Sequence, residues 1–361
     1  MTTFKVALMG VFIVVAQTFE PSSCQELFPS LTITNPRLLS AYMALQAWKL
    51  SMVSDPNGFT TNWVGADVCN YTGVYCAPAP DDEQVTTVAG IDLNHAGIYG
   101  CLPKEIGLLK DLALLHLNSN HFYGLVPECF GSLSQLFELD LSNNLLTGPF
   151  PCVLLQLPSL KYLDIRFNMF YGEIPPQLFD LKLDALFIND NKFVSSLPDN
   201  FGNSPVSVFV GSNNLIKGCI PRSLANMGNT LDEIILSNSQ LTGCFFQEIG
   251  TIKGLKVLDL SSNLLGGSLP ESIGMMTNLE QLNIASNKFI GQVPRSICTL
   301  PNLVNFSYSY NFITGEPEDC LRLPENDDRG NCLPDRPFQR SAEECRSFYS
   351  MPINCEAICC S

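Results

Sequence analysis

The stretch that decides the fold is Leu255–Pro270, which reads LKVLDLSSNLLGGSLP. Within it, Leu258 and Leu260 alternate with polar residues, as in a short strand with one buried face. Asn263 follows where the chain must turn away from that strand. Its side-chain amide can donate to and accept from backbone groups that the turn would otherwise bury unpaired. The glycine pair and the final proline then favour a tight corner and a restricted return path.

The same pattern recurs along the chain, and we count ten copies, most of them spaced by 24 residues, as from Asn120 to Asn144. A fixed period of this length indicates a solenoid, because a single repeat cannot bury its own leucines and only stacked coils form a core. The positions equivalent to Asn263 are Ala96, Asn120, Asn144, Asn168, Asn191, Asn213 or Asn214, Ser239, Asn263, Asn287 and Asn311.

Four segments are expected along the 361 residues. One positive charge followed by a short apolar run predicts a secretory signal peptide over residues 1–16, with an end anywhere up to about residue 23. No later apolar run has the length to span a bilayer, so no membrane anchor is expected. Residues 24–84 predict an N-terminal helical cap, 85–320 the repeats, and 321–361 a cysteine-rich tail. The cap helix should start at Asn35-Pro36 and run to about Val53, burying Leu38, Leu45, Trp48 and Met52.

The net charge of the chain limits the classes of binding partner. The formal net charge is −15, which argues against nucleic acid and against an anionic membrane surface and favours a basic partner. The alternative is that acidity only aids solubility.

Secretion makes disulfides the expected state of most of the 15 cysteines. The short loop from Cys69 to Cys76 favours a local bridge. Cys219 and Cys244 have nearly the same phase in neighbouring coils and should lie about 5 Å apart. Two further pairs differ by one or two positions, namely Cys129 with Cys152 and Cys298 with Cys320.

Other cysteines and two asparagines suggest further chemistry. Cys24, Cys101 and Cys360 are the candidates for a free thiol or an intermolecular bond. Zinc binding by Cys355, Cys359 and Cys360 is the alternative to a tail held by disulfides. The oxidising compartment and the absence of a nearby histidine argue against zinc. Asn70 and Asn305 begin glycosylation sequons. No cofactor and no metal are expected.

Outward positions of consecutive strands should align into a concave surface that combines carboxylates with aromatic rings. Carboxylates attract cationic partners, and aromatic side chains supply the anchors of an interface. The alternative is that the aspartates are ordinary features of the repeat. The candidate ligand-binding residues are Glu138, Asp140, Tyr162, Asp164, Phe187, Phe209, Glu233 and Asp259.

The sequence gives little support for an active site on this surface. Asp140 and Asp164 should stack at roughly the separation that a retaining glycosidase needs. An open sheet, however, provides no water-excluding pocket, and the three histidines are scattered. We therefore predict that the protein is not an enzyme.

The repeat form N-x-L-x-G-x-I/L/V-P resembles the plant-type extracellular leucine-rich repeat, which implies an α/β leucine-rich repeat solenoid with disulfide-bonded caps. Five stretches are similar to the leucine-rich repeat extensin family: LQAWKLSMVSDPNGFTTNWVGADVCNYTGVYCAP, VTTVAGIDLNHAGIYGCLPKEIGLLKDLALLHLNSN, NFGNSPVSV, NFSYSYNFITGE and CLRLPENDDRGNCLPDRPFQRS. The resemblance implies secretion to the plant cell wall, a role in wall assembly and cell growth, and homodimers. It also implies binding of basic, cysteine-rich peptides of the rapid alkalinisation factor type, and contact with pectin through the peptide.

The chain departs from that family at its end, because it stops at Ser361 without the Ser-Pro-Pro runs of an extensin part. Two alternatives follow for covalent anchoring in the wall: the protein is a freely diffusing binder, or the sequence is a fragment of a longer gene product that carries the anchor. The alternative function is inhibition of pectin-degrading enzymes, since polygalacturonase-inhibiting proteins also resemble ten such repeats with disulfide caps. The long tail after Cys320 argues against it.

Overall fold

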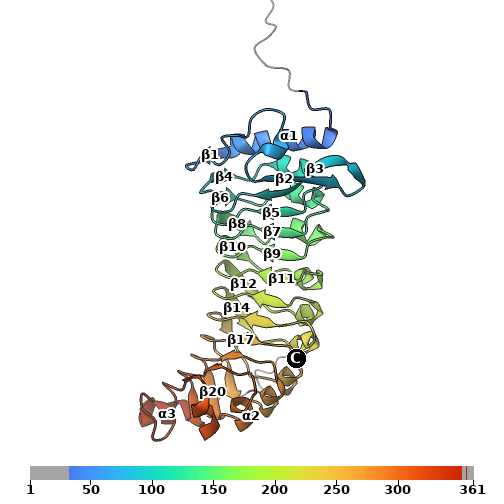
Figure 1. Ribbon diagram of the computed structural model, residues 1–361. Helices are drawn as coiled ribbons and strands as arrows, with labels where there is room; N and C mark the ends of the chain where they lie inside the picture. Colours follow the sequence, from blue (N-terminus) through green and yellow to red (C-terminus); the bar gives the residue numbers. More distant parts are fainter. Residues whose placement is uncertain (1–31, 352–354, 356–361) are drawn as a thin grey trace, which may run out of the picture.

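A computed structural model describes residues 32–351 and Cys355. They form a curved stack of coils with the helix α1 (Pro36–Ser51) over one end and the helix α3 (Ala342–Tyr349) near the other (Figure 1). The predicted leucine-rich repeat solenoid is confirmed. The predicted signal peptide, Cys24, Cys359 and Cys360 lie outside the described residues. Among those described, no helix is both long and apolar enough to cross a membrane.

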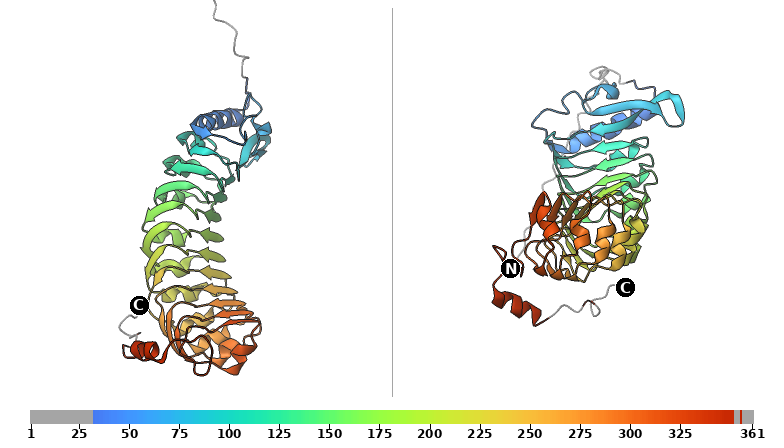
Figure 2. Two further views of the ribbon diagram at one scale, coloured as in Figure 1. Left: turned by 90° about the vertical axis from the view of Figure 1, so that its left-hand side faces the viewer. Right: turned by 60° about the horizontal axis from the view of Figure 1, so that its bottom comes forward.

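Each coil gives one short strand to a twelve-stranded sheet that lines the inner side of the curve (Figure 2). Only its first pair is antiparallel, namely β2 (Val74–Ala79) with β3 (Asp82–Asp92). The remaining strands pair in parallel, one coil after another. They are β5 (Leu114–His116), β7 (Glu138–Asp140), β9 (Tyr162–Asp164), β11 (Ala185–Phe187), β13 (Val208–Val210), β15 (Glu233–Ile235), β17 (Val257–Asp259), β19 (Gln281–Asn283), β21 (Asn305–Ser307) and β23 (Glu325–Asp327).

A second strand in each coil builds a lateral face. Its eight-stranded part runs from β1 to β16, and its three-stranded part from β18 to β22. The strands are β1 (Met52–Ser54), β4 (Tyr99–Cys101), β6 (His121–Gly124), β8 (Leu145–Pro149), β10 (Met169–Gly172), β12 (Lys192–Ser196), β14 (Leu215–Gly218), β16 (Gln240–Leu241), β18 (Gly266–Ser268), β20 (Lys288–Gln292) and β22 (Phe312–Gly315).

Short helices complete the coils, and most of them follow a proline that sets the extended backbone before the first turn. Phe246, which stands where proline is usual, adopts the same extended backbone and is buried. The helices are η1 (Val68–Asn70), η2 (Lys104–Leu108), η3 (Glu128–Ser132), η4 (Cys152–Gln156), η5 (Pro176–Asp180), η6 (Asp199–Asn203), η7 (Arg222–Met227), η8 (Gln247–Thr251), η9 (Glu271–Met275), α2 (Arg295–Cys298) and η10 (Glu318–Arg322).

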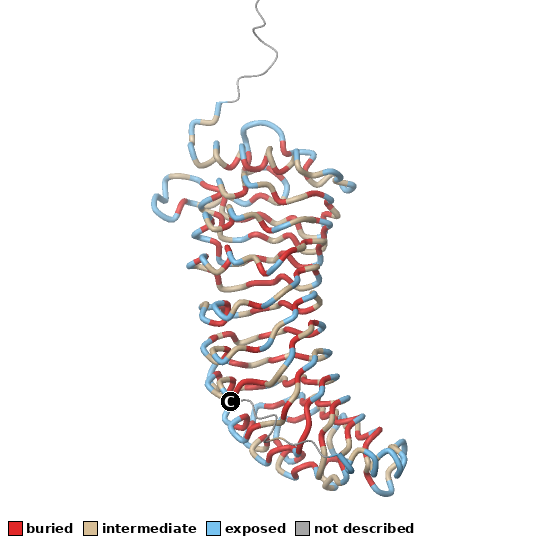
Figure 3. The backbone as a smooth tube through the Cα atoms, turned by 180° about the vertical axis from the view of Figure 1, so that it is seen from behind, coloured by how far each residue is buried: buried red, intermediate tan, exposed pale blue. Residues whose placement is uncertain are grey.

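The core is a spine of inward residues with an asparagine ladder beside it, and buried positions recur in every coil (Figure 3). Leu258 and Leu260 are both buried. The Asn263 Oδ1 accepts from the Leu241 N–H at 3.0 Å, and its Nδ2 donates to the Leu236 carbonyl at 2.9 Å. The amide thus joins neighbouring coils and satisfies groups that the bend buries. Asparagines with equivalent bonds are Asn120, Asn144, Asn168, Asn191, Asn214, Asn287, Asn311 and Asn331.

The N-terminal cap follows its predicted helix closely. The helix α1 (Pro36–Ser51) starts where the Asn35 side chain accepts from the Arg37 N–H at 2.9 Å. It ends two residues before the predicted Val53, because the chain from Met52 enters β1 and pairs antiparallel with β4. Trp48 is fully buried and covers the first coil.

The C-terminal tail differs from its prediction, because it does not leave the repeat at Leu321. Strand β23 pairs with β21, and Asn331 takes the ladder position by accepting from the Ile313 N–H at 3.1 Å. The helix α3 (Ala342–Tyr349), which has no buried residue, then lies against the lateral face. Its Phe348 ring stacks on Phe312 with centroids 3.5 Å apart.

Two bridges join the residue pairs that the sequence favours, Cys69–Cys76 and Cys298–Cys320. The predicted Cys219–Cys244 bridge is wrong, because Cys244 is bonded to Cys355 of the tail. Cys219 is itself in a disulfide. A bridge between Cys332 and Cys345 fastens α3.

The predicted pairing of Cys129 with Cys152 is also wrong, because both are free thiols. Cys129 is the second residue of η3 and partly buried, whereas Cys152 is the first residue of η4 and exposed. One position around a tight helical turn points the two side chains in different directions. Cys101 is free, as proposed for it from the sequence.

Candidate ligand-binding surface

Five of the eight candidate residues form one patch on three neighbouring strands of the concave sheet. The parallel register places Glu138 of β7 beside Tyr162 of β9. It also places Asp140 beside Asp164, and Asp164 beside Phe187 of β11. Adjacent strands are about 4.8 Å apart, so these side chains lie within one ligand footprint. We refer to Glu138, Asp140, Tyr162, Asp164 and Phe187 as the acidic–aromatic patch.

Asp164 is the floor of this patch and not part of its surface, since its side chain is 0% exposed. One carboxylate oxygen lies 3.0 Å from the Arg166 Nε, and the other accepts from the Arg166 N–H at 3.1 Å. The Tyr162 hydroxyl donates to the same carboxylate at 3.4 Å. Burial, followed by repulsion from Asp140, raises the pKa of Asp164 to about 7, while Arg166 opposes the shift. Asp164 therefore carries its full negative charge only above neutral pH.

Tyr162 and Phe187 form the aromatic part of the patch. Their ring centroids are 5.5 Å apart, and both side chains are half-buried. Burial and the neighbouring aspartates raise the pKa of Tyr162 to about 12, so its hydroxyl stays protonated and available as a donor. The guanidinium of Arg166 lies 5.0 Å from the centroid of Phe187, within cation–π distance.

Three residues that border the patch escaped the sequence prediction. Arg166 lies outward two residues after Asp164, where most other repeats have serine or asparagine. Phe137 precedes Glu138 and is 44% exposed, and Phe167 is 45% exposed with a positive φ of 52°. The signal was present in the sequence, because RF stands in the fourth repeat where SN stands in the third.

The other three candidates do not join the patch. Phe209 is buried completely and packs inward, so its assignment to the surface is wrong. In this coil Gly211 stands where other coils have the second inward aliphatic residue, and Asn214 takes the ladder position. The outward positions are therefore one residue later than predicted from the sequence. Val210 is the outward residue. Glu233 and Asp259 are half-exposed on β15 and β17, beyond that apolar interval.

This geometry does not suit catalysis by the two aspartates. A glycosidase needs both carboxyl groups in contact with the substrate, but Asp164 is fully buried. The Asp140 carboxylate accepts from the Ser142 N–H at 2.9 Å and from its hydroxyl at 2.5 Å, which occupies one of its oxygens.

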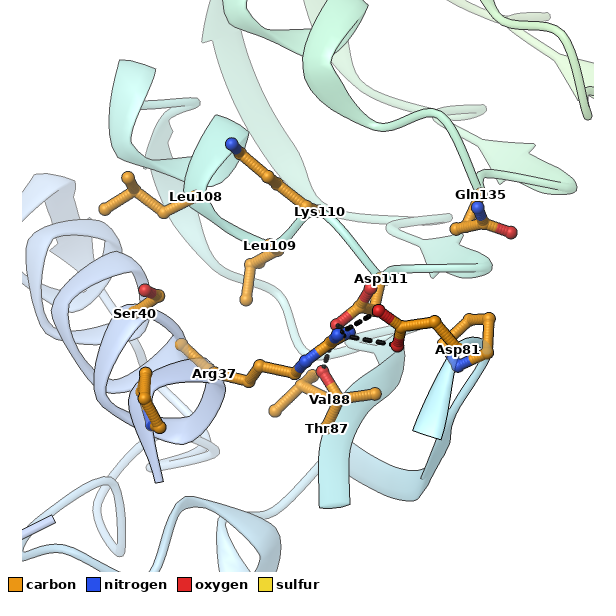
Figure 4. A pocket seen from close by; sticks show the side chains of 13 residues that line it. Arg37, Ser40, Asp81, Thr87, Val88, Leu108, Leu109, Lys110, Asp111 and Gln135 are labelled. Carbon is orange, nitrogen blue, oxygen red and sulfur yellow. Dashed lines mark hydrogen bonds and ion pairs between the residues drawn. The ribbon is translucent and has the colours of Figure 1, made fainter. Parts of the chain in front are cut away.

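A pocket of about 500 Å³ lies between α1 and the first coils (Figure 4). Arg37 points into it, but its guanidinium bonds Asp81 and Asp111 at 2.6 Å each. The Thr87 hydroxyl donates to Asp111 at 2.7 Å. Because Arg37, Asp81, Asp111 and Thr87 bond one another, this cluster joins the cap to the repeats and its charges are already paired.

The two sequons differ in their surroundings. Asn70 is exposed on η1, which the Cys69–Cys76 bridge joins to β2 at the N-terminal edge of the sheet, and its Nδ2 donates to Asp67. Asn305 lies on β21 in the same outward column as Glu138, and its Nδ2 donates to Glu325 at 2.7 Å. A glycan on Asn305 would cover the C-terminal end of the concave sheet, whereas the acidic–aromatic patch lies several strands away. Glycosylation of both residues stays a prediction.

Family comparisons agree with this architecture. Residues 41–77 match the leucine rich repeat N-terminal domain, and residues 110–170, 254–276 and 278–300 match leucine rich repeat families. Leucine-rich repeat extensin-like protein 6 of Arabidopsis thaliana is 69% identical over 91% of this chain, which spans 70% of that protein. Leucine-rich repeat extensin-like protein 3 is 61% identical over 92% of this chain, which spans only 44% of that protein.

Solved structures with this fold include plant receptor ectodomains. The Arabidopsis receptor kinase HAESA, in complex with the peptide hormone IDA and the co-receptor SERK1, is 26% identical and matches 81% of this chain and 54% of its own, with a TM-score of 0.66. The peptide hormone receptor RGFR1 in complex with RGF2 is 27% identical over 64% of this chain and 38% of its own, with a TM-score of 0.60. A plant ice-binding protein is 25% identical over 84% of this chain and 98% of its own, with a TM-score of 0.70.

Proposed function

Because this chain belongs to the leucine-rich repeat extensin-like family, we propose that its concave face binds a basic, cysteine-rich secreted peptide of the rapid alkalinisation factor type. The observation that carries the proposal is the acidic–aromatic patch, in which the half-exposed carboxylates of Glu138 and Asp140 lie beside the rings of Tyr162 and Phe187. The repeat fold does not need aromatic side chains at these outward positions, so Tyr162 and Phe187 are available for binding.

The charge of the patch supports a cationic ligand. The whole chain has a net charge of −15, and a concave wall of carboxylates steers cations toward it. Glu138 also lies 3.2 Å from the His116 ring nitrogen.

The fold is compatible with a peptide ligand, since HAESA and RGFR1 were solved with peptide hormones. At their level of identity this supports the class of ligand and not its sequence. We further propose that the protein is secreted to the cell wall, acts there on wall assembly and cell growth as a homodimer, and contacts pectin through its peptide.

The test is a titration of the purified full chain with a synthetic basic, disulfide-bonded peptide of this type. Affinity should fall as salt shortens the Debye length to about 8 Å at physiological ionic strength. The double variant Glu138→Lys/Asp140→Lys should lower affinity at least about tenfold, since it sets like charges against the ligand. The matched control is Glu83→Lys/Glu128→Lys, which makes the same charge change at two exposed positions outside the patch.

The two variants separate the patch from the net charge. Equal losses in both would assign binding to overall acidity and remove the patch from the proposal. Affinity that neither variant changes, with no salt dependence, would contradict a basic ligand on this face altogether.

A further inference from the structure

The concave sheet carries exposed apolar side chains between the N-terminal cap and the acidic–aromatic patch. Tyr75 on β2, Leu114 on β5 and Phe137 immediately before β7 are 61%, 39% and 44% exposed. The strands β2, β3, β5 and β7 lie side by side at this end of the sheet (Figure 1). Single exposed apolar side chains are common on proteins, but neighbouring ones usually mark an interaction site. We refer to Tyr75, Leu114 and Phe137 as the apolar row.

The strand register places Tyr75 and Leu114 on one surface. Tyr75 is paired with Gly90 of β3, and Gly90 is paired with Leu114. Residues opposite one another on paired strands point to the same face of a sheet. A methyl group on Gly90 would lie 3.5 Å from the Tyr75 Cβ and 3.8 Å from the Leu114 Cβ. The two side chains are therefore neighbours across a residue that has no side chain of its own.

The apolar row is continuous with the acidic–aromatic patch. Leu114 is the register partner of Glu138, and Phe137 precedes Glu138 in the chain. Neighbouring strands are about 4.8 Å apart, so one ligand can place an apolar group on Leu114 and a cation beside Glu138. Lys161 takes the position of Phe137 in the next coil, and its Nζ lies 3.5 Å from Asp184. The cation that follows the row is thus already paired with an acid.

The other end of the concave sheet has a different composition. Amide side chains take outward positions there, namely Gln281 and Asn283 on β19 and Asn305 on β21. The repeat therefore folds equally well with polar residues at these positions. The apolar row is a feature of the N-terminal coils and not a requirement of the fold.

We propose that the apolar row receives aliphatic or aromatic side chains of the same basic peptide, so that the ligand is amphipathic and its apolar end lies toward the N-terminal cap. This inference rests on the proposed function. Exposed ion pairs contribute little to affinity because both partners are well solvated when apart. Apolar groups that leave water supply more of it. The carboxylates of the patch then steer the encounter, and the apolar row sets the lifetime of the complex.

The experiment measures association and dissociation rates of the full chain with the synthetic basic, disulfide-bonded peptide at several salt concentrations. Leu114→Ser/Phe137→Ser should raise the dissociation rate about tenfold, and leave the association rate and its salt dependence unchanged. Tyr75→Ser, which removes the most exposed side chain of the row, should act in the same direction. Thermal melting should show both variants folded.

The matched control is Val257→Ser/Val304→Ser. Val257 and Val304 take the repeat positions of Leu114 and Phe137 in coils near the other end of the sheet, and Val304 is 49% exposed. This variant should bind the peptide like the wild type.

Octalysine is the second probe, because it offers positive charge without apolar side chains. Its affinity should be the same for Leu114→Ser/Phe137→Ser as for the wild type, and lower for Glu138→Lys/Asp140→Lys. A loss of octalysine affinity in the serine variant would mean that the substitutions disturb the acidic–aromatic patch itself, and would overturn the separate role of the row.

Failure of this inference can be distinguished from failure of the proposed function. If the peptide leaves Leu114→Ser/Phe137→Ser at the wild-type rate while Glu138→Lys/Asp140→Lys lowers affinity, the patch binds the peptide without the apolar row. If the wild-type chain does not bind the peptide, both proposals fail. An equal effect in the valine control would remove the row from the site. A concentration-dependent dimer that the serine variant dissolves would assign the row to a second copy of the chain.

Discussion

The repeats and the C-terminal tail of this protein are stabilised by different means. In the repeats, leucines and asparagines are buried at every coil, and each ladder amide bonds backbone groups of two coils. In the tail, α3 buries no side chain and is held by Cys332–Cys345, by Cys244–Cys355 and by ring stacking. Burial and hydrogen bonding therefore make the repeats cooperative, whereas the tail is attached to them mainly by disulfides.

The largest effect on stability should come from the ladder. Asn287→Ala removes the acceptor of the Leu265 N–H at 3.0 Å and the donor to the Leu260 carbonyl at 2.8 Å, and leaves both groups buried without that partner. We expect the free energy of unfolding to fall by about 4 kcal/mol. Denaturant titration followed by circular dichroism measures it.

Introducing an asparagine at a ladder position that lacks one tests the same role of the amide by a gain of stability. Ser239 stands at a ladder position, and its buried hydroxyl has no hydrogen-bond partner. Ser239→Asn should restore the missing bonds and raise the free energy of unfolding by about 1 kcal/mol. A loss of stability in Ser239→Asn, together with little loss in Asn287→Ala, would mean that the amide bonds do not stabilise the repeats.

The repeat architecture was predictable because one residue type serves one purpose at every coil. Asn263 and its equivalents are required by the bend, so their spacing alone indicates the fold. The predicted register and the predicted end of the repeats were wrong where a coil departs from this pattern. Gly211 replaces an inward aliphatic residue and hides the register of Phe209, and the tail continues the ladder at Asn331 after a step of only twenty residues from Asn311.

The second largest effect should come from the buried acid in the repeats. The pKa of Asp164 is about 7 in the folded protein, above its ordinary 3.8. The folded state therefore holds a proton that the unfolded state has released, so stability falls as the pH rises from about 4 to 7. Asp164→Asn should flatten this slope and raise the free energy of unfolding at neutral pH by about 3 kcal/mol.

Asp259→Asn is the matched control, because Asp259 lies in the same outward column and is half-exposed. It should keep the slope of the wild type. If Asp164→Asn instead lowers stability at every pH, the pair with Arg166 outweighs the cost of burying the charge.

The tail should respond differently from the repeats. Cys244→Ser/Cys355→Ser opens a loop of 111 residues. A disulfide of this span would stabilise a fully cooperative fold by about 4.7 kcal/mol in the chain-entropy account. Because each coil contacts only its neighbours, we expect the main unfolding transition to shift by no more than about 1 kcal/mol. Limited proteolysis should instead show rapid cleavage between residues 336 and 351.

Cys298→Ser/Cys320→Ser is the comparison, since both cysteines are buried in the last coils. It should move the main transition more than the tail variant does. A tail variant that lowers the main transition by several kcal/mol would show that tail and repeats unfold together.

The candidate site was harder to predict than the fold. Outward positions are free of the repeat's constraints, so the sequence locates Glu138, Asp140 and Tyr162 on one face but does not say how deep each lies. The burial of Asp164 depends on Tyr162 and Arg166 packing over it. Likewise, the repeat phase predicted Cys219 of the preceding coil as the partner of Cys244. The tail supplies Cys355 instead, and no local pattern encodes that long-range contact.

The smallest expected change concerns Phe167, where stability and binding should move in opposite directions. Its φ of 52° suits asparagine, which occupies the equivalent position at Asn143 with a φ of 53°. Phe167→Asn should therefore raise the free energy of unfolding by about 0.5–1 kcal/mol, while the affinity for the basic peptide falls. Tyr310→Asn is the control, because Tyr310 also has a positive φ and an exposed ring but lies near the C-terminal end of the repeats. If both variants bind the peptide like the wild type, the ring of Phe167 lies outside the site, and its unfavourable backbone conformation has no explanation in peptide binding.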